Sequence, residues 1–342
     1  MPRPLRFAML GTGFWSRFQL AGWKQVGNAE CVALYNRTAA KAKELGELCA
    51  FAPRIYDDPR ELLCREQLDF VDIVTNIETH SQLVHLAAEH RVPMICQKPM
   101  ATSLEEARAM VAVCERAHVP FFIHENWRWQ TPIRKLKEIL ASGAIGTVYR
   151  ARLRMASSFP VFENQPFLKT LEKFLLMDMG SHLLDVARFL FGEATSVYCT
   201  MTRVQQDIKG EDAATVVLKT ASGATVVCEM AYAGTPMEHD RFPHTFAFLE
   251  GDGGSIELGA DYWLRVTTRQ GVQAVHAPPP KYAWADPCYE VVHASIVPCH
   301  LDLLKGLNGN GMPETTAEDN LHTVRLVFSA YESATTNEVI VW

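Results

Sequence analysis

Residues 6–18 read RFAMLGTGFWSRF, and this stretch decides the fold of the first part of the chain. A short apolar run ends at Leu10, Gly11 and Gly13 follow, and a helical pattern starts at once. Strand, glycine turn and helix in this order are typical of a dinucleotide-binding unit. Gly11 permits the tight turn, and Gly13 lets a pyrophosphate approach the backbone beside the unpaired N–H groups of the helix start.

The third small position of this glycine motif is Ser16 rather than Gly or Ala. A small side chain still allows the helix to pack closely on the strand. Two glycines also occur in ordinary strand–helix turns, which leaves a simple tight turn as the alternative. The residues of this turn that we predict to contact the cofactor are Gly11, Gly13, Phe14 and Trp15.

Short apolar runs and helical patterns alternate as far as about residue 128. This alternation favours an α/β fold with a doubly wound parallel sheet of the Rossmann type, covered by helices on both faces. We place this dinucleotide-binding domain at residues 1–127. Strands are predicted at 6–10, 30–36, 70–76, 93–99 and 120–126, and helices at 15–26, 37–50, 80–91 and 103–118.

Beyond residue 128, apolar and polar residues alternate along the predicted strands, and Ser222-Gly223 separates two valine-rich runs as in a hairpin. We expect an α+β domain at 128–342 with a large, mostly antiparallel open sheet. Its C-terminal helix, capped by Thr316, could pack back on the first domain. Strands are predicted at 147–158, 196–204, 214–233, 244–259 and 262–271, and helices at 132–143, 175–192 and 316–334.

The composition excludes several classes of protein. The 342 residues are 48% hydrophobic and 21% charged, as in a globular protein of about two domains. No apolar run approaches the roughly 18–20 residues that span a bilayer, and the N-terminus does not read as a signal peptide. The net charge of -6 comes without a basic stripe, so neither nucleic acid nor membrane is expected as a partner. The nine cysteines form no CxxC pair, which favours free thiols in a reducing cytoplasm, and no metal-ligand spacing is present.

The end of the second predicted strand should contact the adenosine ribose. Asn36 can bond the ribose hydroxyls, and Arg37 could stack on adenine or pair with a 2′-phosphate. Arg37 taken alone favours NADP slightly, whereas the neutral Asn36 is compatible with NAD. A helix start at Asn36 with a solvated Arg37 is the alternative.

The run PMICQKPMA ends a predicted strand at Lys98, which is followed by Pro99. Open α/β sheets bind ligands at the carboxyl ends of their strands, so Lys98 lies at the mouth of the crevice. It could hydrogen-bond a substrate hydroxyl and the nicotinamide ribose. A solvated loop lysine is the alternative interpretation.

The stretch LLMDMGSHLLDVARFLFG, residues 175–192, predicts an amphipathic helix with an unusual polar stripe. Asp178, His182 and Asp185 share one face of this helix, at i, i+4 and i+7. From the pattern alone, Asp178 could be a helix cap and His182 a buried core histidine. Asp185 is expected to be structural, bonding His182 or nearby backbone.

Polar and aromatic residues cluster in HENWRWQ, residues 124–130, where the last parallel strand meets the second domain. Trp127 could stack on the C–H face of a sugar, and Asn126 and Arg128 could bond its hydroxyls. A packed hinge with buried tryptophans is the alternative. We predict Asn126, Trp127 and Arg128 as substrate-binding residues.

Several motifs together resemble the Gfo/Idh/MocA oxidoreductases: GTGFWS, TNIETH at 75–80, CQKPMA, DMGSHLLD, SGAIGTVYRARL and PETTAEDNLHTVRLVFSAYES. The resemblance spans nearly the whole chain. It implies a Rossmann domain, a second domain whose open sheet supports substrate binding and oligomerisation, and hydride exchange between nicotinamide and a sugar or polyol. One departure is Gln97, where the family usually has a glutamate beside the lysine.

The resemblance also implies the roles of individual residues. Asp178 and His182 match an Asp–His pair that projects into the substrate pocket beside the lysine. His182 or Lys98 would remove the hydroxyl proton, and Asp178 would orient the sugar. The further cofactor-binding residues that the motifs imply are Asn76, Thr79, His80, Gln97 and Lys98.

The expected protein is therefore an NAD-dependent sugar dehydrogenase acting on CH–OH groups, and a homodimer or homotetramer. NADP as cofactor, or inositol or another polyol as substrate, remains open. A protein that senses NAD(P) without catalysis is a rival of another class, and an NAD-dependent glycosidase is a third possibility.

Overall fold

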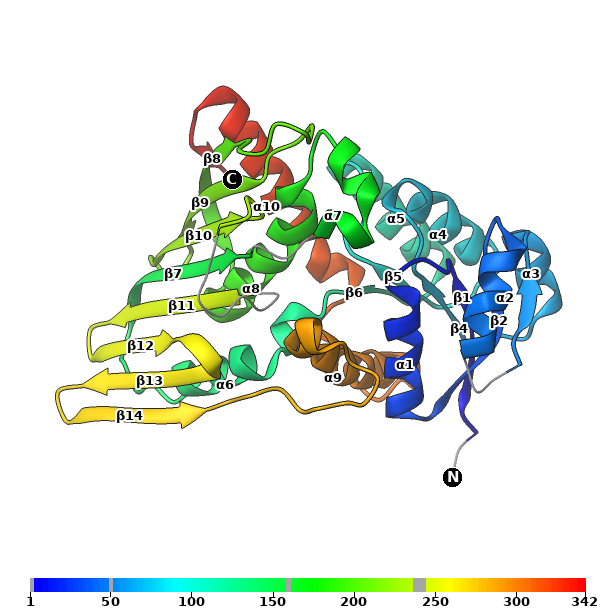
Figure 1. The fold of residues 1–342 in the computed structure, drawn as a ribbon, viewed down its shortest axis with the longest axis horizontal. Helices are drawn as coiled ribbons and strands as arrows, with labels where there is room; N and C mark the ends of the chain where they lie inside the picture. Colours follow the sequence, from blue (N-terminus) through cyan, green and yellow to red (C-terminus); the bar gives the residue numbers. More distant parts are fainter. Residues whose placement is uncertain (1–2, 49–51, 158–160, 236–243) are drawn as a thin grey trace. The chain divides into compact units, whose positions relative to one another are not determined.

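The computed structural model describes residues 3–48, 52–157, 161–235 and 244–342 (Figure 1). The chain divides into two compact units. The first consists of Met1–Glu125 and Ile296–Val324, and the second of Asn126–Ser295 and Arg325–Trp342. The first boundary lies two residues before the expected 127/128 boundary, and a C-terminal segment belongs to the first unit.

A six-stranded parallel sheet forms the first unit, in the strand order β3-β2-β1-β4-β5-β6. The order reverses between β1 and β4, as in doubly wound nucleotide-binding folds. The strands are β1 Leu5–Leu10, β2 Ala29–Tyr35, β3 Arg54–Tyr56, β4 Phe70–Ile73, β5 Met94–Gln97 and β6 Phe121–His124. The helices between them are α1 Ser16–Val26, α2 Ala39–Leu48, α3 Pro59–Arg65, η1 Ile77–Thr79, α4 His80–Glu89 and α5 Leu104–Ala117.

The core of the first unit lies on both faces of this sheet, because its strands are continuously apolar. β4, β5 and β6 are buried along their whole length. Phe7 stacks on Phe70 with ring centroids 4.9 Å apart, and Trp23 of α1 lies against both rings. Each such side chain contributes about 1.5–3 kcal/mol by leaving water.

A nine-stranded sheet forms the second unit, in the order β14-β13-β12-β11-β7-β10-β9-β8-β15. Its neighbours pair antiparallel except β7 with β10, which confirms the mostly antiparallel sheet (yellow to green in Figure 1). The strands are β7 Val148–Ala156, β8 Ala194–Thr202, β9 Ala213–Thr220, β10 Thr225–Ala231, β11 His244–Gly251, β12 Gly254–Leu258, β13 Trp263–Thr268, β14 Gly271–His276 and β15 Ile340–Val341.

Helices and short helical turns complete the second unit and link it to the first. They are η2 Trp127–Trp129, α6 Thr131–Ala141, α7 Val161–Asn164, η3 Pro166–Thr170, η4 Leu176–Gly180, α8 Ser181–Phe191, η5 Ala260–Tyr262, η6 Pro287–Tyr289, α9 Glu290–Leu307 and α10 Ala317–Thr336. α9 and α10 each contribute residues to both units. Within the described ranges, no helix is long and apolar enough to cross a membrane.

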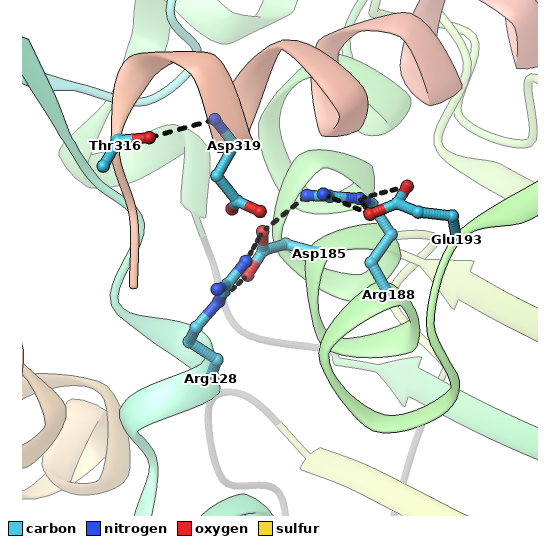
Figure 2. A network of polar contacts seen from close by, with 6 residues as sticks. All are labelled: Arg128, Asp185, Arg188, Glu193, Thr316 and Asp319. Atoms are coloured by element: carbon cyan, nitrogen blue, oxygen red, sulfur yellow. Dashed lines mark hydrogen bonds and ion pairs between the residues drawn. The ribbon is translucent and has the colours of Figure 1, made fainter. Parts of the chain in front are cut away.

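Two local predictions are confirmed. The hairpin at Ser222-Gly223 joins β9 to β10, and Gly223 takes the left-handed conformation (φ 91°) that the turn needs. Thr316 caps α10, because its Oγ1 accepts the backbone N–H of Asp319 at 3.1 Å (Figure 2). The predicted segment ends at 49–50 and 158 lie outside the described residues.

Other elements differ from the prediction. Residues 175–192 do not form one regular α-helix, because Leu176–Gly180 is a π-helical turn that leads into α8. β3, α3, β14, β15 and α9 were not predicted. α9 runs through Pro298, a residue that normally ends a helix, so its apolar run gave no clear helical signal.

Candidate functional site

The glycine turn after β1 has the geometry that a pyrophosphate requires. Gly11 has φ 105°, and a Cβ there would lie 2.6 Å from the carbonyl oxygen of Val74, so only glycine fits. Ser16 Oγ donates to Gly11 O at 3.0 Å and ties the turn to α1. A Cβ on Gly13 would meet no described atom within 4 Å, which leaves the backbone open to a ligand. These features fit a bound dinucleotide.

Phe14 and Trp15 lie at the start of α1 and are half-buried. Their rings pack against Phe18, with centroids 5.5 and 5.8 Å away. The guanidinium of Arg17 lies over the rings of Phe14 and Phe18, at 4.9 and 4.5 Å. The aromatic side chains that follow the glycine turn are thus held against the first turns of the helix.

The end of β2 is fixed by hydrogen bonds and surrounded by acids. Asn36 Nδ2 donates to Thr38 O at 3.0 Å. Burial raises the pKa of Tyr35, Arg37 lowers it, and Asp58 and Asp57 raise it in turn. Two carboxylates are therefore within electrostatic range of this strand end.

His80 joins the loop after β4 to the loop after β5. Its Nε2 lies 3.1 Å from Thr75 O, and its Nδ1 lies 3.1 Å from Pro99 O. Burial lowers the pKa of His80, while the hydrogen bonds to these carbonyls raise it. Thr79 Oγ1 makes 2.8 Å hydrogen bonds to Thr75 Oγ1 and Asn76 O. His80 and Thr79 thus support the loops that carry Asn76 and Lys98.

The predicted cofactor residues gather along one edge of the first sheet. Gly11 follows β1, Asn76 follows β4, Gln97 ends β5 and Lys98 follows it. β1, β4 and β5 are neighbouring parallel strands, so their carboxyl ends share one edge. This edge includes the switch point between β1 and β4, where such sheets bind nucleotides.

In the second unit, Asp178 lies in the π-helical turn η4 and His182 in the first turn of α8. The helical stretch begins before Asp178, so Asp178 is not the helix cap. π-Helical turns occur frequently at functional sites, because they displace side chains from the regular helical stripe. A Cβ on Gly180 would lie 3.3 Å from Met230 Sδ, so glycine lets this turn approach β10 closely.

His182 is buried, and its imidazole stacks on Trp127. The ring centroids are 4.6 Å apart and the planes differ by 8°. On the same segment, Met179 Sδ lies 3.2 Å from the hydroxyl of Tyr232. Burial, followed by the nearby Asp178 carboxylate, raises the pKa of Tyr232 well above its usual value. Trp127 and Tyr232 therefore support the two residues that we predict to handle substrate.

Arg128 pairs with Asp185, one helical turn beyond His182 (Figure 2). Its Nε and Nη2 donate to the two carboxylate oxygens at 2.8 and 2.6 Å, and both side chains are almost fully buried. Arg188 joins Asp185 at 3.7 Å and Glu193 at 2.6 Å. Asp185 thus pairs with two arginines, which fits the structural role that we expect for it.

Asn126 is also engaged in the structure of its own unit. Its Nδ2 donates to Ser295 Oγ at 2.8 Å and to Val292 O at 3.2 Å. The contacts of Asn126, Trp127 and Arg128 are those of a packed support for η2. Binding of substrate by these three residues stays a prediction.

A cavity of about 420 Å³ in the second unit lies over β7, β8, β9 and β10. Arg152, Arg154, Thr200 and Glu229 are among its lining residues, and neither Asp178 nor His182 is. Its lining includes the exposed Arg152 and the buried Met230.

Comparison with known proteins identifies the family. Residues 5–125 match the "Oxidoreductase family, NAD-binding Rossmann fold", and residues 133–257 match the "GFO/IDH/MocA C-terminal domain". A relative from Paraburkholderia graminis, named D-apiose dehydrogenase, is 42% identical over 327 residues, which cover 96% of this chain and 87% of the relative. The chain belongs to the Gfo/Idh/MocA family.

Two further relatives extend the likeness of this Gfo/Idh/MocA protein. A second relative, from Rhizobium rhizogenes and also named D-apiose dehydrogenase, is 39% identical. The match covers 98% of this chain and 97% of the relative. The crystal structure of an oxidoreductase from Agrobacterium radiobacter, in complex with NAD+, L-tartaric acid and magnesium, superposes with a TM-score of 0.96. It is 38% identical, and 98% of each chain is covered.

The family settles the class of chemistry. This Gfo/Idh/MocA protein is an oxidoreductase, and its cofactor is NAD. Gly11, Gly13 and the start of α1 would hold the pyrophosphate, and NAD supplies a hydride acceptor at C4 of its nicotinamide when bound. Arg37 taken alone slightly favoured NADP, and the comparisons favour NAD instead.

The sequence did not indicate which residues hold the start of the helical stretch that carries Asp178 and His182. Glu211 and Tyr331 are buried and contact residues 174–177, but they lie far from them in the chain. The signal available was a single acid pair, Glu211-Asp212, directly before a predicted strand. An acid pair in that position is normally a solvated loop, so it gave no reason to place Glu211 in the core.

Proposed function

We propose that this oxidoreductase is an NAD-dependent aldose dehydrogenase whose substrate is D-apiose. The observation that carries the proposal is the pair of relatives at 42% and 39% identity over nearly the full chain, both named D-apiose dehydrogenase. The stretches YNRT, CQKPM, HENWRWQ and GSHLLDVARFLFGEA also resemble that enzyme. In the proposed reaction, C1 of the sugar loses a hydride to NAD and its hydroxyl loses a proton, which gives the lactone and NADH.

Two groups of the chain are proposed to manage the proton. His182 takes it from the C1 hydroxyl, since an imidazole changes charge near neutral pH. Lys98 stabilises the oxygen as negative charge develops, or shares the role of base. Asp178 accepts a hydrogen bond from another sugar hydroxyl and so fixes which carbon presents its hydride.

We also propose a homodimer or homotetramer in the cytoplasm, acting in carbohydrate catabolism. One face of the nine-stranded sheet exposes paired charges and large apolar side chains. Arg152 pairs with Glu229 there, and Phe248 lies opposite Arg152 in the register with 44% of its surface exposed. Light scattering of the purified protein tests the oligomer, and a monomer would refute it.

The test of the substrate is turnover. Purified protein is offered D-apiose, xylose, glucose and inositol, each with NAD and with NADP, and NADH or NADPH formation is followed by absorbance. We expect the highest kcat/KM with D-apiose and NAD. Turnover of inositol or glucose without turnover of apiose would reject the assignment, and release of an aglycone without net NADH would indicate a glycosidase.

A further inference from the structure

The helix that carries Asp178 and His182 begins without a polar side chain of its own at the cap. The first helical hydrogen bond runs from Asp178 N to Phe174 O, at 2.9 Å. The N–H groups at the start of a helix have no acceptor inside the helix. A Ser, Thr, Asp or Asn normally supplies one, but Phe174 stands at this position. The acceptors must therefore come from elsewhere in the unit.

Glu211 supplies these acceptors from the segment that leads into β9. Its Oε1 accepts the N–H of Leu176 at 2.9 Å, and its Oε2 accepts the N–H of Phe174 at 3.3 Å. Its backbone carbonyl accepts the N–H of Leu175, also at 3.3 Å. The carboxylate lies at the positive end of the helix dipole, where a negative charge is favourable. Glu211 thus replaces a local cap by a distant one.

Tyr331 of α10 completes this cap. Its hydroxyl donates to Glu211 Oε1 at 2.6 Å and accepts the N–H of Met177 at 3.3 Å. Burial, and then the neighbouring Glu211 carboxylate, raise the pKa of Tyr331 well above its usual value, so the phenol keeps its proton. The N–H groups of four successive residues, 174–177, therefore end on one buried glutamate–tyrosine pair.

The approach of the Glu211 loop depends on Gly210. A Cβ at Gly210 would lie 2.7 Å from Leu171 O and 2.8 Å from Phe174 Cβ, closer than side chains pack. Lys209 N also donates to Lys169 O at 2.9 Å, which ties the two segments together. The backbone is thus built to bring Glu211 against the start of this helix.

We propose that Glu211 is a positioning residue for the sugar site: with Tyr331 it fixes the turn that presents Asp178. This rests on the proposed function, because Asp178 is there assigned to a sugar hydroxyl. Met177, held by Tyr331, directly precedes Asp178 in the π-helical turn. A loosened cap lets this turn move, and the hydrogen bond to the sugar weakens before the cofactor site is affected.

The test uses Glu211→Gln and Tyr331→Phe in the full chain. Glu211→Gln should raise KM for the aldose about tenfold, the scale of one charge-assisted hydrogen bond, while kcat changes less and the Kd of NADH stays constant. Tyr331→Phe, which keeps the carboxylate, should change KM in the same direction but by less. In both variants, hydrogen–deuterium exchange should accelerate at the amides of 174–178.

The matched control is Tyr56→Phe, since the Tyr56 hydroxyl also donates to a buried glutamate, Glu66, at 2.6 Å, in the first unit. It should leave KM for the sugar unchanged. If the Glu211 and Tyr331 variants lose stability like the control with KM unchanged, Glu211 is merely structural and the proposal fails. If the wild type oxidises no aldose, the proposed function fails, and unchanged exchange at 174–178 would separately overturn the cap.

Discussion

Each unit shapes the start of one helix by a different means. After β1, Gly11 and Gly13 contribute no side chain, and a Cβ on Gly13 would meet no described atom within 4 Å. In the second unit, the N–H groups at the start of the helix are already occupied by Glu211 and Tyr331. The backbone after β1 is thus accessible for the pyrophosphate contact that we predict, whereas side chains cover the helix start in the second unit.

The largest expected effect is a loss of turnover on replacing His182, a buried side chain of the second unit. His182→Ala should lower kcat by about 10²–10⁴-fold, because a positioned base contributes on that scale. The Kd of NADH, measured by fluorescence titration, should not change, since the proposed dinucleotide contacts lie in the first unit. Lys98→Met is the companion variant. Turnover at the wild-type rate in both would remove these residues from the mechanism.

The glycine turn can be broken in two separable ways. Gly11→Ala should destabilise the protein by more than about 2 kcal/mol, because a left-handed φ and a backbone clash add together. Gly13→Ala adds a Cβ in open space, so thermal stability should hold while the Kd of NADH rises. Calorimetry and NADH titration measure the two effects. A Gly13→Ala protein that binds NADH normally would show that the pyrophosphate does not lie there.

The buried pair of Arg128 and Asp185 joins η2, which carries Trp127, to α8, which carries His182. Variants of this pair test how much it stabilises the second unit. Asp185→Asn leaves Arg128 charged and buried, which should cost about 3–5 kcal/mol in denaturant unfolding. The double variant Arg128→Leu with Asp185→Leu should recover much of that loss, since no unpaired charge remains. Glu138→Gln, in an exposed pair with Lys135, is the control and should change stability little. Equal losses in all three would contradict the buried pair's role.

A buried acid in the first unit makes the stability of the protein depend on pH. Desolvation raises the pKa of Asp72 to about 7, although Trp23 Nε1 donates to it at 2.7 Å and lowers the pKa. The stabilising contribution is complete below the unfolded pKa near 4, and it is lost as pH rises through about 7, by up to about 4 kcal/mol. Asp72→Asn should remove this part of the pH dependence, measured by unfolding at pH values on both sides of this range. An unchanged slope would show that Asp72 ionises normally.

The contrast between the units also explains what the sequence could reveal. Gly11, Lys98 and the alternating apolar runs follow from local patterns, and the first sheet was predicted except for the short β3. The pairing of Arg128 with Asp185 could not be read from the sequence, because the two residues lie 57 positions apart. Glu211 was missed because its partners, Leu176 and Tyr331, are distant in the chain. Contacts of this range leave no periodic signal.

Residues 296–324 belong to the first unit, so a fragment of the N-terminal residues alone would lack part of its core. The rings of Trp23 and His300 stack with their centroids 3.7 Å apart, and Phe122 forms a β-bridge with Thr316. α9 and the following loop therefore complete the core of the first unit. A fragment that ends at residue 127 would expose the indole of Trp23 and the edge of β6 to water. A minimal, self-sufficient nucleotide-binding module would need both pieces of chain, joined by an artificial linker or expressed together.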